Sequence, residues 1–304
     1  MSTLTSGGTV GLGIKRLSAS KEPDTSTKKY DDIAILVDIS SCIGCKACEA
    51  ACQQWHDLAP PLFTPEEVQQ LKFVSYQSRP DLEHNLFMLM KFNEGETERG
   101  FTWFITKYQC MHCREPGCLI ACPSPGAVIQ YLNGVVDFDH SKCIGCKMCL
   151  VGCPFDIPRY DKNNKPWKCN FCIDRVASGL EPACVKTCPT NALTFGTKIE
   201  MVEKGKKIVE HLKERGFKDA TLYDPSGVDG TGYIYVLPHG NHINEYQLPE
   251  NPKIEASISF WKGPLKTLGS FALLGSIFAI FVQLILWGPI KVFENKEEDK
   301  KKEE

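Results

Sequence analysis

The sequence lacks scattered cysteines. All sixteen cysteines of the 304 residues fall in four short motifs, and none lies between them. Disulfide frameworks are typical of much smaller secreted domains, so metal ligation explains this distribution better than cross-linking. The chain also lacks a strong net charge, because 35 basic and 37 acidic residues leave −2. We therefore expect no nucleic-acid partner.

Residues 1–30 lack both an apolar segment of the length of a signal-peptide core and a twin-arginine pair. We expect no conventional signal peptide there and interpret 1–30 as a flexible N-terminal arm. The rest of the chain shows neither a Gly-rich nucleotide-binding fingerprint nor a G-x-S-x-G elbow. Since every cysteine already belongs to a motif, we predict no catalytic residue on this chain.

The first and third motifs share one spacing. Residues 42–52 read CIGCKACEAAC and residues 143–154 read CIGCKMCLVGCP. Both follow C-x2-C-x2-C-x3-C, the pattern of bacterial ferredoxins. Gly44 and Gly145 are expected to permit close approach to a cluster, because a side chain there would crowd it. The fourth cysteine is expected to begin a helix that points away, and so to ligate the neighbouring cluster.

The second and fourth motifs, residues 110–123 and 169–189, widen the gap between their second and third cysteines to four and eleven residues. Both keep the terminal C-x3-C-P. Sixteen cysteines supply four ligands to each of four [4Fe–4S] clusters, so no histidine ligand is required. His112, inside the second motif, is expected near a cluster or at the surface. Together the motifs predict a non-catalytic electron-transfer subunit.

The spacing between motifs bears on which of them share clusters. Twenty residues separate Cys122 from Cys143, and they contain Asn133-Gly134, a strong hairpin signal. This favours one module made from the second and third motifs, which leaves the first to pair with the fourth. A rival pairing of the third motif with the fourth stays open, with fifteen intervening residues and no hairpin signal.

Exchange of the fourth cysteines within each favoured pair gives four predicted ligand sets. They are Cys42, Cys45, Cys48 and Cys188 (set 1); Cys52, Cys169, Cys172 and Cys184 (set 2); Cys110, Cys113, Cys118 and Cys153 (set 3); and Cys122, Cys143, Cys146 and Cys149 (set 4). Structural zinc also uses four cysteines, but usually from two separated C-x2-C pairs. Lys46, Lys147 and Lys168 adjoin ligands, and are expected either to raise cluster potentials or simply to be exposed.

We predict an α+β fold of two ferredoxin-like modules with nested cluster pairing over residues 31–250. Strands are expected at 34–38 and 233–237, and a hairpin at 86–92 and 101–107 around a polar turn. A helix at 64–71 is predicted by a capping box. A second helix at 198–215 is expected to end at Gly216.

Residues 267–290 contain no charge over 24 positions, and about 20 apolar residues cross a bilayer core. We predict a single transmembrane helix there, after a linker at 251–266 and before a charged tail at 291–304. Trp261 and Trp287 suit its interfaces. Five lysines follow the helix and three precede it within a similar distance, which favours a cytoplasmic tail and a periplasmic cluster domain at the inner membrane.

Four longer segments carry a family resemblance: DISSCIGC at 38–45, MHCREPGC at 111–118, EPACVKTCPT at 181–190 and SFWKG at 259–263. On these residues the chain resembles the beta subunits of membrane-bound respiratory formate dehydrogenases, from about Tyr30 to Pro289. Nitrate-reductase relatives replace one motif cysteine with tryptophan, and this chain does not.

The resemblance implies a three-subunit complex. A catalytic alpha subunit with a molybdenum or tungsten pterin oxidises formate, and a membrane gamma subunit with b-type haem reduces quinone. It also implies the nested pairing, and export of the folded chain with a partner. Two alternatives remain at this point: the same relay in a hydrogenase or sulfur-compound reductase complex, and a zinc-binding membrane scaffold protein.

Overall fold

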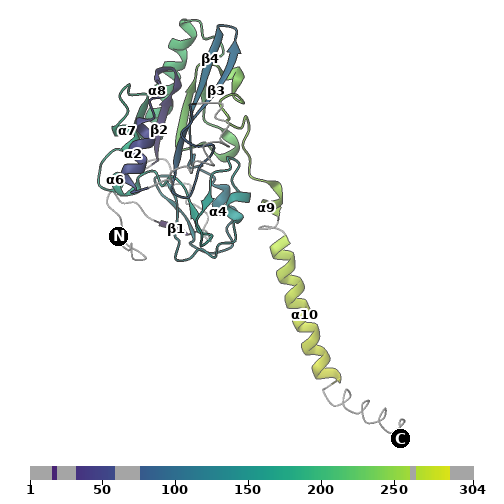
Figure 1. Ribbon diagram of the computed structural model, residues 1–304. Helices are drawn as coiled ribbons and strands as arrows, with labels where there is room; N and C mark the ends of the chain where they lie inside the picture. The colour runs from purple at the N-terminus through teal and green to yellow at the C-terminus, as the bar shows by residue number, and fades with distance from the viewer. Residues whose placement is uncertain (1–15, 19–31, 59–75, 261–264, 288–304) are drawn as a thin grey trace, which may run out of the picture. The chain divides into compact units, whose positions relative to one another are not determined.

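The computed structural model describes residues 16–18, 32–58, 76–260 and 265–287 (Figure 1). The chain divides into two units, with the boundary between Glu255 and Ala256. The helix predicted at 64–71, most of the arm at 1–30 and the tail at 291–304 lie outside the described residues.

The first unit alternates short strands with short helices, as the motif spacing predicts. Its strands are β1 (Arg16–Ser18), β2 (Ile33–Asp38), β3 (Met88–Thr97), β4 (Gly100–Gln109), β5 (Val128–Tyr131), β6 (Val136–Phe138), β7 (Arg159–Tyr160), β8 (Pro166–Trp167), β9 (Leu193–Thr197), β10 (Thr221–Tyr223) and β11 (Tyr233–Leu237). Its α-helices are α2 (Ala47–Trp55), α4 (Gly117–Ala121), α5 (Met148–Val151), α6 (Ile173–Ala177), α7 (Ala183–Lys186) and α8 (Lys198–Glu214). The strands expected at 34–38 and 233–237 are β2 and β11.

A four-stranded sheet of order β10-β11-β2-β9 organises this unit. The central strand β2 pairs parallel with β11 and antiparallel with β9. Its side chains alternate between two faces. Ala34 and Leu36 join the core with α8, whereas Ile35 and Val37 join the larger core that contains the cysteines. The uninterrupted apolar run of β2 therefore reflects a strand covered on both sides.

The helix α8 lies beside β2 in Figure 1 and matches the helix predicted at 198–215. Thr197 caps its first turn, and Glu200 completes a capping box. Its buried face packs on the sheet through Met201, Val209 and Leu212. The chain leaves the helix through Gly216, whose φ of +92° is the left-handed conformation expected of a C′ glycine.

The helices that carry cysteines pack in two pairs. The strand β2 leads into the first motif and β9 follows the fourth, and their antiparallel pairing brings α2 against α7. The helix α4 packs against α5. The hairpin β5–β6 connects α4 to α5 through the predicted turn, where Gly134 has a φ of +84°. The predicted hairpin at Asn133-Gly134 is therefore present.

The ribbon β3–β4 contains the other predicted hairpin but has a shorter turn. Its ladder runs from Met88 paired with Gln109 to Thr97 paired with Gly100. The expectation of a polar turn across the whole NEGETERG segment is wrong, because most of that segment continues the strands. Glu94 and Glu96 are exposed on the ribbon, so their polarity reflects contact with water and not a turn.

The second unit contains α9 (Ala256–Phe260) and α10 (Lys266–Trp287). Within α10, Thr267–Leu286 has a mean hydropathy of 2.2, and none of this span is buried. A surface so apolar is unfavourable in water and is long enough to cross a bilayer core. The predicted transmembrane helix is thus present over residues 267–286.

Candidate iron–sulfur centres

Each cysteine motif ends in the same local structure. The helices α2, α4, α5 and α7 all begin one residue before the third cysteine of their motif; these cysteines are Cys48, Cys118, Cys149 and Cys184. The expectation that the fourth cysteine begins a helix is therefore wrong. The third and fourth cysteines are four residues apart in every motif. Cys52 lies within α2, whereas Cys122, Cys153 and Cys188 follow the last residue of their helices, so one short helix separates ligands of two predicted sets.

The residue before the second cysteine adopts a left-handed conformation in all four motifs. Gly44, His112, Gly145 and Phe171 have φ values of +66°, +49°, +74° and +62°. This conformation turns the backbone N–H toward the first cysteine of the motif. The N–H groups of His112, Gly145 and Phe171 lie 3.5, 3.4 and 3.4 Å from the first Sγ.

These amide donors favour the charged thiolate. Burial raises the pKa of the Cys42 thiol, and the N–H of Gly44 counteracts this. Contacts within the protein also restrict the two glycines of these motifs. A Cβ on Gly44 would lie 2.7 Å from Cε1 of Phe92, and one on Gly145 would lie 3.2 Å from Cβ of Asn164. The conformation and the neighbouring side chains therefore favour glycine here, and the expected close approach to a cluster stays a prediction.

Two cavities in the first unit are each lined by four cysteines that come from two motifs. One contains Cys42, Cys45, Cys48 and Cys188, and the other contains Cys122, Cys143, Cys146 and Cys149. Apart from two lysines in the first and one in the second, their linings are uncharged; no carboxylate of the described residues lines either cavity. Four thiols in a largely apolar cavity suit an iron–sulfur cluster.

The other eight cysteines also gather in two groups of four. Burial raises the pKa of Cys52 well above its usual value, and the thiolates of Cys169, Cys184 and Cys172 raise it further. Burial likewise raises the pKa of Cys113, with further increases from Cys110, Cys153 and Cys118. The structure therefore brings together the cysteines that were predicted as sets 2 and 3.

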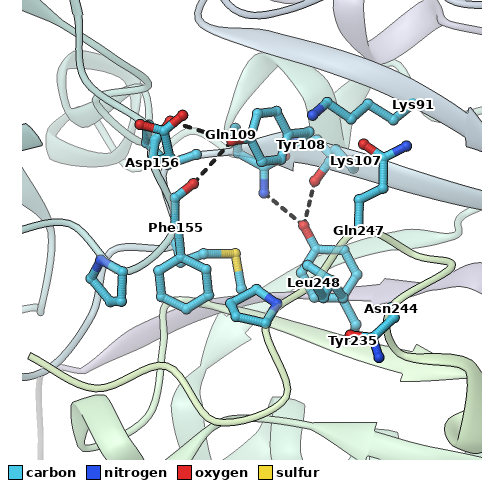
Figure 2. Close-up of a pocket in the computed structure, with 14 residues that line it drawn as sticks. Lys91, Lys107, Tyr108, Gln109, Phe155, Asp156, Tyr235, Asn244, Gln247 and Leu248 are labelled. Atoms are coloured by element: carbon cyan, nitrogen blue, oxygen red, sulfur yellow. Dashed lines mark hydrogen bonds between the residues drawn. The ribbon is translucent and has the colours of Figure 1, made fainter.

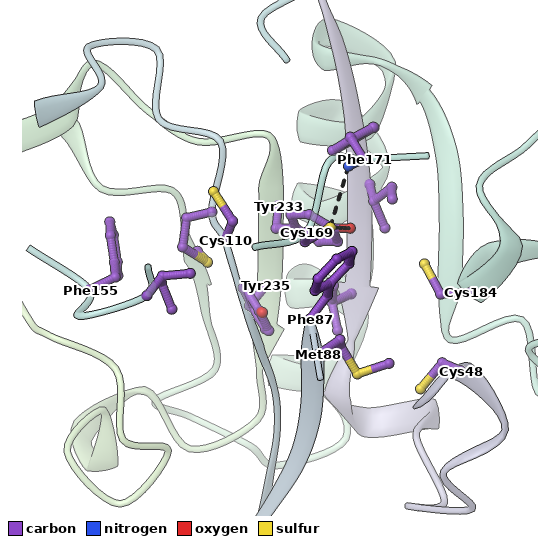
Figure 3. Close-up of a cluster of buried hydrophobic side chains, with 14 of the residues drawn as sticks. Cys48, Phe87, Met88, Cys110, Phe155, Cys169, Phe171, Cys184, Tyr233 and Tyr235 are labelled. Carbon is purple, nitrogen blue, oxygen red and sulfur yellow. Dashed lines mark hydrogen bonds between the residues drawn. The ribbon is translucent and has the colours of Figure 1, made fainter. Parts of the chain in front are cut away.

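Neighbouring sets lie close to one another in a fixed order. The thiolate of Cys184 in set 2 raises the pKa of Cys48 in set 1. The thiolate of Cys169, also in set 2, raises the pKa of Cys110 in set 3. The thiolate of Cys149 in set 4 raises the pKa of Cys118 in set 3. Figure 3 shows Cys48 and Cys184 together on one side of Cys169, with Cys110 on the other. The four sets thus follow one another as 1, 2, 3 and 4.

The described cysteines are not arranged around a single metal ion. A zinc ion binds thiolates at about 2.3 Å, which holds the four sulfurs roughly 4 Å apart. Within the described part of the chain, no group of three or more His, Cys, Asp or Glu side chains is arranged to hold a single metal ion. A multi-iron cluster is larger and accepts a wider quartet.

Several polar groups contact the cysteine sulfurs directly. The hydroxyls of Tyr160 and Tyr233 lie 3.2 Å from Cys149 and 3.5 Å from Cys169. Nε2 of His56 lies 3.5 Å from Cys172. Sequence reasoning missed all three, because these side chains lie outside the motifs they serve or carry no spacing signal.

His112 and the three lysines beside ligands differ in their surroundings. His112 is fully buried, and its Nδ1 accepts a hydrogen bond from the N–H of Val136 at 3.0 Å. Burial lowers the pKa of His112 well below its usual value. Lys147 is exposed and Lys46 is half-buried. Lys168 is only 6% exposed, so the alternative that it is simply a surface lysine is wrong.

A further cavity, of about 350 Å³, lies beside set 3 (Figure 2). Its lining includes Lys91 and Asp156, and the hydroxyl of Tyr108 donates to the carbonyl of Phe155 at 2.9 Å. Figure 2 also shows Tyr235 held between Lys107 and Gln109. No cysteine lines this cavity, so it is not a cluster site.

Cysteine quartets shared between motifs, together with an apolar helix outside the cysteine-bearing unit, define a membrane-anchored iron–sulfur protein. Comparisons with known proteins agree. Residues 41–127 and 101–198 each match the family model described as 4Fe-4S dicluster domain. Residues 254–297 match the model described as formate dehydrogenase N, transmembrane.

Curated relatives show which family of membrane-anchored iron–sulfur proteins the chain resembles. The nitrate-inducible formate dehydrogenase iron–sulfur subunit of Escherichia coli K12 is 45% identical over 290 residues, which cover 94% of this chain and 96% of the relative. The formate dehydrogenase iron–sulfur subunit of Haemophilus influenzae is 46% identical over 88% of this chain and 83% of its own length. A hydrogenase-2 operon protein, HybA of Escherichia coli O157:H7, is 32% identical over 58% of this chain and 55% of its own. The chain therefore belongs to the family of electron-transfer iron–sulfur subunits of respiratory formate dehydrogenases.

Proposed function

We propose that this chain holds four [4Fe–4S] clusters on sets 1 to 4 and relays electrons from a formate-oxidising subunit to a membrane subunit. One observation carries the proposal. Cys188, from the fourth motif, lines the same cavity as Cys42, Cys45 and Cys48 of the first. This supports the nested pairing over the rival pairing of the third motif with the fourth. The packing of α2 on α7 and of α4 on α5 supports it independently.

The order of the sets supports a single route through the protein. Each cluster, when bound, supplies a site for one electron at a time. Cys45 and Cys146 are the two exposed cysteines, and they belong to set 1 and set 4. Sets 2 and 3 lie between them and contain no exposed cysteine. Electrons would therefore enter at one terminal set and leave at the other.

The proposed partners follow from the family. A catalytic subunit with a molybdenum or tungsten pterin would oxidise formate, and a cytochrome b subunit would pass the electrons to quinone. The names of the relatives support formate over hydrogen, since the hydrogenase-2 operon protein matches only 58% of the chain. A zinc scaffold is disfavoured because residues 41–127 and 101–198 match 4Fe-4S dicluster models.

The proposed domain organisation is that inferred from the sequence. Residues 1–30 form an arm, 31–250 the four-cluster domain and 251–266 a linker. The membrane helix occupies 267–290 and the tail 291–304. The lysine distribution supports a periplasmic cluster domain and a cytoplasmic tail at the inner membrane.

Purification of the complex in mild detergent tests the function. We expect about sixteen iron atoms and about sixteen acid-labile sulfides per chain, and reduction of an artificial acceptor by formate. Zinc in place of iron, or activity with hydrogen but not with formate, would contradict the proposal.

A pair of matched substitutions tests the ligand sets. Cys188→Ser should remove the EPR signal of the cluster on Cys42, Cys45 and Cys48. Cys153→Ser, which also changes a fourth cysteine, should remove instead the signal of the cluster on Cys110, Cys113 and Cys118. If Cys188→Ser abolished the cluster on Cys169 and Cys172 and left that on Cys42 intact, the exchange of fourth cysteines would be wrong.

A further inference from the structure

Two lysines are buried among the cysteine sets. Lys107 on β4 is 2% exposed, and Lys168, just before the fourth motif, is 6% exposed. Burying an ammonium group costs several kcal/mol unless opposite charge compensates it. The carboxylate of Asp137 is one charged neighbour of Lys168. The other acidic neighbours of the two lysines are thiols and one phenol.

Lys107 lies between set 1 and set 2. It lines the cavity of set 1 together with Cys42, Cys45, Cys48 and Cys188. Its acidic neighbours are Cys184, Cys169, Cys48 and Tyr235. Every one of these acidic neighbours except Tyr235 is a cluster ligand.

Lys168 occupies the corresponding position between set 2 and set 3. Its Nζ donates to the carbonyl of Cys169 at 3.0 Å and to that of Val136. Its acidic neighbours are Cys110, Asp137, Cys118 and Cys169, and the thiolate of Cys110 accepts a hydrogen bond from it.

Both ammonium groups are held in place. Nζ of Lys107 donates to Oε1 of Gln109 at 3.2 Å and lies 4.6 Å from the ring centre of Tyr233. Nζ of Lys168 lies 5.3 Å from the ring centre of Phe138. Because side-chain motion cannot carry these charges to water, they act on the sets at a fixed distance.

We propose that Lys107 and Lys168 are fixed counter-charges that raise the reduction potential of the cluster on set 2, which lies between them. A nearby positive charge stabilises the form that has gained an electron, and the effect is large where water is excluded. Lys107 acts also on set 1 and Lys168 on set 3. The ring of Phe138, which lies 5.3 Å from Nζ of Lys168, lines the cavity of set 4. Set 2 alone has both charges as neighbours. This inference rests on the proposed function.

Redox titration of the purified complex, followed by EPR, tests the inference. In Lys107→Met the clusters on set 2 and set 1 should become reduced, and give their EPR signals, only at a lower potential than in the wild type. At the wild-type midpoint the ratio of reduced to oxidised set 2 should fall at least tenfold, which is about 59 mV for one electron. In Lys168→Met the set 2 and set 3 signals should shift in the same direction. Set 4 should stay unchanged in Lys107→Met and should shift less than set 2 in Lys168→Met.

Lys186→Met is the matched control, because Lys186 is exposed on α7 only two residues from Cys184. Removal of this solvent-screened charge should change the ratio of reduced to oxidised set 2 by less than twofold at the wild-type midpoint. Lys107→Arg and Lys168→Arg keep the positive charge, so the potential of set 2 should stay close to the wild-type value in both. A set 2 shift in Lys107→Met no larger than in Lys186→Met, or an equal shift of all four signals, would overturn the inference.

A salt titration of the wild type covers the case in which the methionine variants lose iron. Added salt screens exposed charges strongly and buried ones weakly. The set 4 potential, beside exposed Lys147, should move with salt, and the set 2 potential should not. Equal salt dependence of the two sets would overturn the inference. Failure of the proposed function would be distinct, since wild-type complex would then lack iron or show fewer than four signals.

Discussion

The rings of His112 and Phe171 meet edge to face, with centroids 5.0 Å apart and planes at 82°. The two residues occupy the same position in the second and fourth motifs, where the other two motifs have glycine. Both adopt positive φ, which costs roughly 1–2 kcal/mol for a residue with a Cβ. Their mutual packing and burial offset that strain. Neither residue can therefore be exchanged for glycine without loss, although the backbone alone would favour glycine.

The first prediction concerns Phe171. In Phe171→Gly the backbone strain is relieved, but a fully buried ring is lost, so the protein should be destabilised by about 3–5 kcal/mol. Gly145→Ala, which adds only a Cβ at positive φ, should cost about 1–2 kcal/mol. Denaturation of the anaerobic holoprotein compares the two. Equal or greater stability of Phe171→Gly would show that the strain outweighs the packing.

The second prediction concerns the contact between α4 and α5. A Cβ on Gly152 would lie 2.5 Å from the carbonyl oxygen of Gly117 and 2.6 Å from Cβ of Ala121. Gly152→Ala should therefore push the helices apart, cost about 1–3 kcal/mol and weaken the EPR signals of sets 3 and 4. Gly179→Ala is the control, because nothing lies within 4 Å of its Cβ. Gly179→Ala should keep the EPR signals of all four sets. Unchanged iron content in Gly152→Ala would refute the prediction.

The third prediction is a pH dependence. His239 is buried between Phe104 and Phe217. Burial lowers its pKa below the usual 6.5, and Arg99 and His242 lower it further, against the opposing effect of Asp219. Below pH 6.5 the unfolded chain takes up a proton that the folded protein resists, so stability falls as the pH drops.

His239→Phe removes this titration and keeps an aromatic ring. Between about pH 7 and pH 5 its thermal midpoint should fall less than that of the wild type. Holoprotein in one detergent and at one ionic strength provides the comparison. An equal fall in both proteins would show that His239 does not contribute to the acid sensitivity.

The fourth prediction concerns membrane anchoring. Ile277 lies near the middle of the apolar span and is 56% exposed. Ile277→Asp should disfavour insertion by about 2.5–3.5 kcal/mol and move the chain toward the soluble fraction after an alkaline wash. Ile199→Asp is the matched control, since Ile199 is 55% exposed on α8. Full membrane retention of Ile277→Asp would contradict the assignment of this helix to the bilayer.

Local patterns predicted the parts of this protein that depend on local chemistry. The cysteine spacing, the Asn133-Gly134 hairpin, the apolar run of β2 and the helix α10 each specify their structure within a few residues. The capping box of Thr197 and Glu200 is equally local and agrees with the predicted start of α8 at Lys198. The error in the β3–β4 turn arose because exposed strand residues and turn residues share the same polarity.

Non-local contacts could not be predicted. Nothing in the sequence indicates that β2 pairs with β11, nearly two hundred positions later. The burial of Lys168 and the approach of His56 to Cys172 depend equally on how distant segments pack. Lys107 lies in a strand between other polar residues and has no motif of its own. For these residues only the assembled core distinguishes an internal charge from a surface one.

The cavity shared by Cys42 and Cys188 imposes an order on biosynthesis. Cys188 is translated 146 residues after Cys42, a delay of roughly 7–30 s at ordinary rates of elongation. During that interval the first motif has emerged from the ribosome with no fourth ligand available. The quartets shared between the second and third motifs are complete earlier. Iron delivery would therefore begin in the middle of the chain, and the outermost site would close last and seal the ends of the domain together.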